Sequence, residues 1–119
     1  RFMLALKVVM AEIGVAGTLI FDEVDAGIGG GTADAVGERL SRLAGDKQIL
    51  VVTHSPQVAA RANHHWIVHK GGDDIVTTNV LELSSRQERC EEIARMLSGA
   101  SISQEARAAA DKLLEASAA

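Results

Sequence analysis

The sequence TLIFDEVD, at residues 18–25, is a short apolar run that ends abruptly in two adjacent carboxylates, Asp22 and Glu23. A continuous apolar run of this length is typical of a fully buried strand in a parallel sheet. The polar end of the run matters because ligands in open α/β sheets bind at the carboxyl ends of the strands. We therefore expect an α/β fold whose functional residues begin at Asp22.

The segments around this run alternate between helix and strand patterns. Residues 2–13 are apolar almost without a break and contain no Pro or Gly, which favours a buried helix. After a glycine-rich loop at residues 27–31, apolar residues recur every three or four positions up to Leu43, which predicts an amphipathic helix capped by Thr32. Residues 49–52 form a second apolar strand. Strand, helix and strand in this order predict a parallel sheet with helices on its faces.

The rest of the chain shows a helix start, a hairpin and two helices. Ser55 followed by Pro56 is typical of a helix N-terminus. Residues 66–68 and 75–83 are strand candidates on either side of a Gly-Gly-Asp-Asp turn, which predicts a β-hairpin with an extended loop. Capping-box patterns open two further helices, at residues 85–97 and 101–116.

Composition limits the possible classes of function. The chain has 119 residues, 47% hydrophobic and 24% charged, so it is globular and forms one domain or part of one. A net charge of -4 argues against an extended basic DNA-binding face, and an aromatic content of 3% argues against base-stacking platforms. The lone Cys90 excludes an intrachain disulfide and fits a reducing cytoplasm. Because the chain opens with Arg1 rather than Met, a fragment or processed chain is expected.

Adjacent carboxylates at the end of an apolar strand are costly without a positive partner. A magnesium ion bound to a phosphate would supply that charge, and Asp22 is suited to hold it. Glu23, the next carboxylate, could then polarise a water for attack on a γ-phosphate. The alternative is a pair of solvated acids that open a loop, and the two residues alone do not decide between these interpretations.

Two further clusters follow the strands. The loop at residues 25–31 is rich in glycine but lacks the Gly-Lys-Ser/Thr ending of a phosphate-binding P-loop, so its glycines indicate a tight turn or a close approach to another surface. His54 stands at the end of the second strand, where it could contact a phosphate oxygen or orient a water. A flexible turn and a structural histidine are the alternatives.

Three other histidines cluster in the second half of the chain: His64, His65 and His69. In a strand, His65 and His69 would share one face while His64 points to the other. Neither a Cys nor an acidic residue stands nearby to complete a tetrahedral set. The pattern therefore does not favour a metal site at these histidines.

The order of these signals is more specific than any one of them. A strand with Asp-Glu, a glycine loop with Asp25, an amphipathic helix and a strand with Thr-His resembles the second half of an ABC/SMC-type ATPase head, which is a P-loop NTPase-like fold. Within that superfamily, the amino-acid sequence of these motifs resembles the RecN family of bacterial DNA-repair ATPases over residues 1–115. The stretches that carry this resemblance are FDEVDAGIGG (residues 21–30), VTHSPQVAA (52–60), ANHH (62–65) and EEIARMLSG (91–99).

The resemblance implies a role for each matching residue. Asp22 and Glu23 match the Walker B acids, namely the magnesium-associated Asp and the catalytic Glu. Residues 25–29 match the D-loop, so Asp25, Gly27 and Gly29 are implied at the nucleotide and at a second head. His54 matches the switch histidine that senses the γ-phosphate. The Gly29-Gly30-Gly31 run contains one glycine more than the family pattern.

The resemblance also implies partners and a setting. The fold is the C-terminal lobe of a head, with a mostly parallel sheet, flanking helices and a β-hairpin. ATP and Mg²⁺ are the cofactors, and the Walker A half, the Q-loop and the signature motif lie outside the chain. A second head completes the site as a homodimer, DNA binds through other parts, and no membrane is involved. The implied setting is double-strand break repair and recombination in the bacterial cytoplasm, at the nucleoid.

This segment alone is predicted to be inactive because it lacks the loop that cradles phosphates. Two alternatives remain at this stage. One is the ATPase half-domain of another ABC/SMC machine, either a transporter or a chromosome organiser. The other is a non-catalytic dimerisation module that keeps the fold without the activity.

Overall fold

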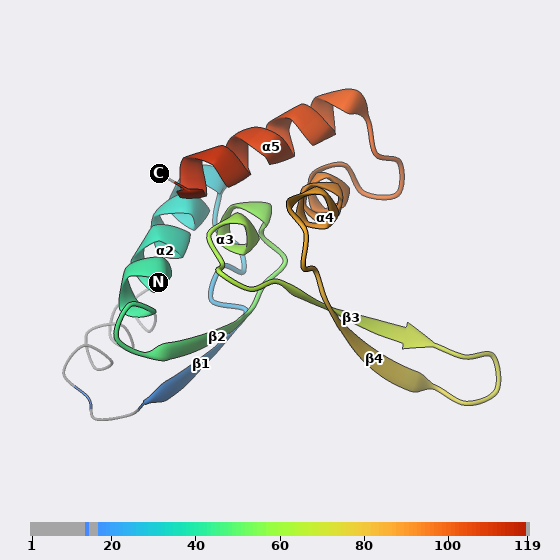
Figure 1. Ribbon diagram of the computed structural model, residues 1–119, viewed down its shortest axis with the longest axis horizontal. Coiled ribbons are helices and arrows are strands. Elements are labelled where there is room, and N and C mark those ends of the chain that lie inside the picture. Colours follow the sequence, from blue (N-terminus) through green and yellow to red (C-terminus); the bar gives the residue numbers. More distant parts are fainter. Residues whose placement is uncertain (1–13, 15–16, 119) are drawn as a thin grey trace. The chain divides into compact units, whose positions relative to one another are not determined.

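The computed structural model describes residue 14 and residues 17–118. The predicted helix at residues 2–13 lies outside these described residues. The chain divides into two compact units, Arg1–Arg61 and Ala62–Ala119. The elements follow the predicted order (Figure 1): β1 (Thr18–Asp22), α2 (Gly30–Leu43), β2 (Gln48–Val52), α3 (Pro56–Ala60), β3 (Trp66–Gly71), β4 (Thr77–Glu82), α4 (Arg86–Ser98) and α5 (Gln104–Ala118).

The first unit contains the predicted parallel strand pair. Strands β1 and β2 pair in parallel, from Thr18 opposite Gln48 to Asp22 opposite Val52. Helix α2 connects them, as parallel strands require a crossover that is longer than a tight turn. The register confirms the prediction that matters most for function, because the polar ends of both strands lie at the same edge.

The core of the first unit lies on one face of these strands. Phe21 packs with Ala33 and Leu40 of α2 and with Val58 of α3. The opposite face is open among the described residues, and Ile20 is 68% exposed there. The prediction that the strands are buried on both faces is therefore wrong for the described residues, because α2 and α3 both pack against the face that carries Phe21.

Helices α2 and α3 approach each other closely at Gly37. A Cβ atom at this position would lie 3.0 Å from Arg61 Cγ and 3.3 Å from the backbone Cα of Val58. The Arg61 side chain is itself held, because its Nη2 lies 3.0 Å from Asp34 Oδ1 in α2. Glycine at position 37 thus allows a helix contact in which backbone meets backbone.

The start of α2 differs from the prediction. The helix begins at Gly30 with Gly29 as N-cap, and no side chain caps it, so the prediction that Thr32 is the cap is wrong. Gly29 is extended (φ -78°, ψ 166°), as an N-cap residue must be, and glycine is tolerated at that position. Thr32 therefore lies inside the first turn.

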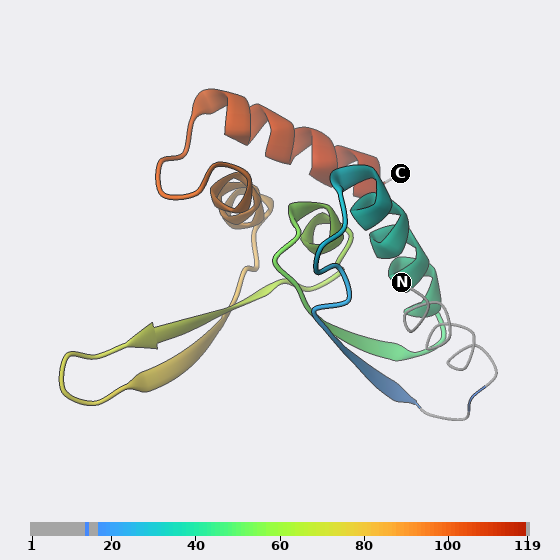
Figure 2. The ribbon, with the colours of Figure 1, turned by 180° about the vertical axis from the view of Figure 1, so that it is seen from behind.

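The second unit consists of a hairpin and a helix pair. Strands β3 and β4 pair antiparallel from Trp66 opposite Glu82 to Gly71 opposite Thr77, and Figure 2 shows this hairpin from behind. The hairpin was predicted, although β3 is longer and β4 shorter than expected. Helices α4 and α5 bury Ile93 and Ala94 of α4 and Ala110 of α5. None of the described helices is long and apolar enough to cross a membrane.

The predicted capping box is present at the start of α4 but not at the start of α5. The hydroxyl of Ser85 accepts a hydrogen bond from the Glu88 amide (3.1 Å), and the Glu88 carboxylate accepts one from the Ser85 amide (3.0 Å), which is the predicted capping box. In α5 the prediction of a box at residues 101–104 is wrong. Ser103, the residue directly before the helix, accepts from the Ala106 amide at 3.1 Å instead. Of the two serines before α5, Ser103 rather than Ser101 accepts this bond, because Ser103 is directly adjacent to the first turn.

Candidate functional site

The candidate site lies where β1 and β2 end side by side. Asp22 is the last residue of β1, and Val52 opposite it is the last residue of β2. The pairing continues one residue further, since the Glu23 amide donates to the Val52 carbonyl oxygen at 2.9 Å. The backbone of Glu23 therefore lies beside Val52, two residues before His54. Both of these predicted site residues thus follow the ends of paired strands, as the sequence predicted.

The side chains of Glu23 and His54 meet above this edge. His54 Nε2 lies 3.5 Å from Glu23 Oε1, and the side chains are 88% and 59% exposed, respectively. An exposed pair of this kind contributes little to stability. Both groups are thus accessible to solvent and to a ligand, while they remain close enough to act on the same molecule.

Glu23 has an unusual backbone conformation. Its φ is +50°, which makes it the one non-glycine residue with positive φ among the described residues. Such a conformation costs about 1–3 kcal/mol, and residues that adopt it cluster at functional sites. The cause is local: the Glu23 amide still pairs with β2, while its carbonyl accepts from the Ala26 amide at 3.1 Å. The chain must therefore turn at Glu23 itself.

Asp25 is the buried acid of the site, with 9% exposure. Its Oδ2 accepts a hydrogen bond from the hydroxyl of Thr53 and a second from the Ser55 amide at 3.0 Å. The Ser55 amide also lies 2.9 Å from the Thr53 hydroxyl oxygen. These bonds satisfy a carboxylate that would be costly to bury without partners. They join the loop after β1 to the loop after β2.

Ser55 also starts the next helix, as predicted. Its hydroxyl accepts from the Val58 amide at 3.4 Å and lies 2.9 Å from Gln57 Oε1. Pro56 occupies the first turn of α3, where its missing amide hydrogen costs nothing. One residue therefore caps α3 and contacts Asp25.

The glycines of the predicted D-loop differ in what they do. Gly27 has φ +74°, so the turn after Asp25 requires glycine there. A Cβ at Gly29 would meet no atom within 4 Å, whereas one at Gly30 would lie 3.3 Å from Gln57 Nε2. Gly27 shapes the loop, and Gly29 leaves its surface open. The assignment of Asp25, Gly27 and Gly29 to a nucleotide stays a prediction.

Residues that could hold a metal are sparse in the described part of the chain. No group of three or more His, Cys, Asp or Glu side chains there could form a complete metal site. Asp22 is exposed at the end of β1 and could supply one carboxylate to Mg²⁺, which usually keeps several waters and takes its other ligands from phosphates. That donor set fits an ion that arrives with a nucleotide.

The histidines of the second unit have other surroundings. His64 Nδ1 lies 3.0 Å from Glu82 Oε1. His65 is half-buried, and this burial, followed by the nearby positive charge of Arg89, lowers its pKa below the ordinary value, although the charge of Glu92 opposes the shift. A lowered pKa keeps His65 neutral over more of the pH range.

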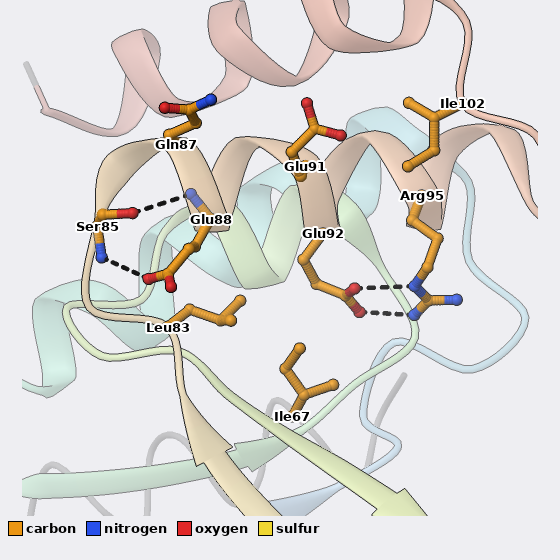
Figure 3. Close-up of a pocket in the computed structure, with 9 residues that line it drawn as sticks. All are labelled: Ile67, Leu83, Ser85, Gln87, Glu88, Glu91, Glu92, Arg95 and Ile102. Carbon is orange, nitrogen blue, oxygen red and sulfur yellow. Dashed lines mark hydrogen bonds and ion pairs between the residues drawn. The ribbon is translucent and has the colours of Figure 1, made fainter.

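A hollow lies between the hairpin and α4 in the second unit, and Figure 3 shows its lining. Its acids are already engaged: Glu88 caps α4, Glu91 pairs with Arg107, and Glu92 pairs with Arg95. The pKa values of these three carboxyl groups are lowered by those hydrogen bonds. Each of these carboxylates therefore already has a hydrogen-bond partner among the described residues.

Sequence reasoning noted Thr53 but assigned it no role. Its hydroxyl is one of two groups that connect Asp25 to the loop of His54, the other being the Ser55 amide. The available signal was the Thr-His pair directly after an apolar strand, with an unpaired acid about thirty residues earlier in the loop after the neighbouring strand. That signal identifies two loops that meet, but it does not identify which side chains bond.

Comparison with known proteins shows that the chain is similar to bacterial DNA repair proteins named RecN. It is 50% identical over 115 residues to the DNA repair protein RecN of Xylella fastidiosa, which covers 97% of this chain and 21% of that protein. It is 48% identical over 115 residues to RecN of Streptomyces coelicolor and 54% identical over 99 residues to RecN of Deinococcus radiodurans. The chain is similar to one segment of RecN. No family model matches it.

The chain spans about a fifth of the length of the RecN proteins that it matches. A solved structure from work on "ATP-driven dimerization and DNA stimulated activation of SMC ATPases" has the same fold, with a TM-score of 0.65 and 20% identity. The match covers 83% of this chain and 58% of that one. This likeness shows the fold alone: the chain has the predicted α/β fold, and that fold is similar to part of the SMC ATPase structure.

Proposed function

We propose that this chain supplies the Walker B, D-loop and switch-histidine part of an ATP-hydrolysing head that acts in DNA repair. The observation that carries this proposal is the approach of His54 Nε2 to Glu23 Oε1, 3.5 Å apart, above the joined ends of β1 and β2. A general base and a phosphate-contacting group must both reach the same phosphoryl group. The similarity to RecN over nearly the whole chain supports repair of DNA as the setting.

Each residue has a distinct task in this proposal. Asp22 would hold a magnesium ion, which neutralises charge on the phosphates when it is bound. Glu23 would accept a proton from the attacking water. His54 would contact a γ-phosphate oxygen. The D-loop around Gly27 and Gly29 would face a second head.

The proposal requires groups that the motifs of this chain do not supply. A Walker A loop must cradle the phosphates, because most of the charge stabilisation in phosphoryl transfer comes from such contacts. ATP would lie between two heads, and DNA would bind through other parts of the protein. We therefore expect the 119 residues alone to show no ATP turnover.

The test is Glu23→Gln in the full-length protein. Loss of a general base lowers turnover about 10²–10⁴-fold, while ATP binding and ATP-dependent association of heads persist. The matched control is Glu38→Gln, the same change at an exposed acid of α2 that pairs with Arg42. Because Glu38 lies within α2 rather than at the strand ends, its variant should keep normal turnover.

Turnover unchanged by Glu23→Gln would contradict the role of Glu23 as general base. Absence of turnover in the unaltered full-length protein would contradict the proposal as a whole and would favour a dimerisation module without catalysis. An ATPase head of another machine, such as a transporter or chromosome organiser, would also lose turnover on Glu23→Gln. That alternative is separated by the survival of cells that carry Glu23→Gln after DNA breakage. Loss of survival supports the repair setting, and normal survival contradicts it.

A further inference from the structure

We propose that Thr53 is a positioning residue for ATP hydrolysis, which it serves by bonding Asp25, two residues after Glu23, to the loop that carries His54. This inference rests on the proposed function and adds a residue that the sequence patterns did not assign. The first observation is that Asp25 Oδ2 accepts from the Thr53 hydroxyl and from the Ser55 amide. Thr53 and Ser55 are the two neighbours of His54 in the chain, so one carboxylate oxygen holds a side chain on one side of His54 and the backbone on the other.

The same carboxylate fixes the turn that carries Glu23. Asp25 lies two residues after Glu23, inside a turn closed by the bond from the Ala26 amide to the Glu23 carbonyl. The left-handed conformation of Glu23 needs surroundings that hold it in place. Since Asp25 is buried and bonded to the other loop, it supplies that restraint.

The side chains of Glu23 and His54 are not held in place by their contact with each other. Their side chains are largely exposed and lie at 3.5 Å, which is longer than an ordinary hydrogen bond. Exposed side chains lose their geometry unless the backbone beneath them is fixed. The partly buried bonds between Asp25, Thr53 and Ser55 are therefore the part of the site that sets the distance between Glu23 and His54.

Threonine suits this position for a chemical reason. Its hydroxyl has one proton, which goes to Asp25, and its oxygen accepts from the Ser55 amide at 2.9 Å. The branched side chain also has few rotamers, so the hydroxyl is held toward Asp25. Valine would preserve the shape and remove both bonds, whereas serine would keep the hydroxyl.

The experiment measures kcat and KM for ATP in the full-length protein carrying Thr53→Val. We expect kcat to fall roughly 10- to 100-fold with little change in KM, because misplacement of catalytic groups by about 1 Å costs on that order. Thr53→Ser should restore most of kcat. Thr18→Val is the matched control, since the Thr18 hydroxyl donates to Gln48 Oε1 (2.9 Å) at the opposite end of the same strand pair.

A second pair of variants shows whether Thr53 acts through the site. In a Glu23→Gln background, Thr53→Val should lower the residual turnover no further. Asp25→Ala, which removes the acceptor for both bonds, should lower kcat as Thr53→Val does, and the double variant should be no less active than the less active of the two single variants. Asp25→Ala also tests these bonds if Thr53→Val does not fold.

Each remaining outcome overturns the inference. Normal kcat in Thr53→Val, or a loss that Thr53→Ser does not restore, would show that the hydroxyl is not needed. An equal loss in Thr18→Val would indicate a general effect on the strand pair. If Glu23→Gln hydrolyses ATP normally, the proposed role of Glu23 fails and the positioning role fails with it, whereas a defect in Glu23→Gln beside a normal Thr53→Val refutes the positioning role alone.

Discussion

Replacement of Gly37 by alanine is the most direct test of how the first unit is packed. The new Cβ would lie 3.0 Å from Arg61 Cγ, 3.3 Å from Val58 Cα and 3.4 Å from the Gln57 carbonyl oxygen. Two of these atoms belong to the backbone of α3, which cannot rotate away as a side chain can. The third belongs to a side chain that Asp34 holds at 3.0 Å. The whole of α3 must therefore shift by a few tenths of an ångström.

The size of the effect follows from two opposing contributions. Overpacking of a close contact costs about 1–3 kcal/mol. Exchange of glycine for alanine inside a helix returns about 1 kcal/mol through helix propensity. Gly31→Ala is the matched control, because its Cβ would meet no atom within 4 Å and only the favourable contribution applies. We expect Gly37→Ala to be less stable than Gly31→Ala by about 1–3 kcal/mol.

Hydrogen exchange of peptides from α2 and α3 measures this difference in the full-length protein. A difference of about 1–3 kcal/mol corresponds to roughly 5- to 150-fold faster exchange in Gly37→Ala than in Gly31→Ala. Peptides from α4 should exchange equally in both variants. Equal or slower exchange of α3 in Gly37→Ala would refute the reasoning, because the helices would then tolerate a methyl group at their closest point.

Two further predictions concern the second unit. Ser85→Ala should destabilise the start of α4 by about 1 kcal/mol, because it removes the acceptor for the Glu88 amide. Hydrogen exchange at the start of α4 checks this, and Ser84→Ala, which leaves that acceptor in place, should change it less. The pKa of His65 is lowered in the folded chain, so the unfolded chain binds the proton more readily, and stability should fall as pH drops through about 6.5 toward the folded pKa. His65→Gln should flatten this dependence in thermal melts between about pH 8 and about pH 5.5, whereas the same change at exposed His69 should preserve it; an unchanged slope in His65→Gln would contradict the assignment.

Much of the fold could be predicted because its signals are local. The apolar runs that became β1 and β2 end at polar residues, and the amphipathic segment between them forces a crossover. From this order alone, the ends of both strands must share one edge, which places Glu23 near His54. The capping box at Ser85 was equally local, since its two partners lie three residues apart.

The bonds of Asp25 could not be predicted in this way. Whether its carboxylate points to solvent or inward depends on the positive φ angles of Glu23 and Gly27, which turn the loop. A left-handed glutamate has no sequence signature, because it is imposed by pairing with β2 on one side and by the turn to Ala26 on the other. Exposure of Ile20 was missed for a related reason: an apolar run indicates that a strand is buried, but not what covers each face.

Ser55 links the packing of α3 to the geometry of the candidate site. Its hydroxyl caps α3, and its amide donates to Asp25, so any shift of α3 pulls on the loop that carries His54. Gly37→Ala and Thr53→Val therefore disturb the same distance by different means: the first moves α3 as a body, and the second removes a single hydroxyl. Because the side chains of Glu23 and His54 are exposed while the bonds of Asp25 are partly buried, the geometry of the accessible pair depends on residues outside the pair.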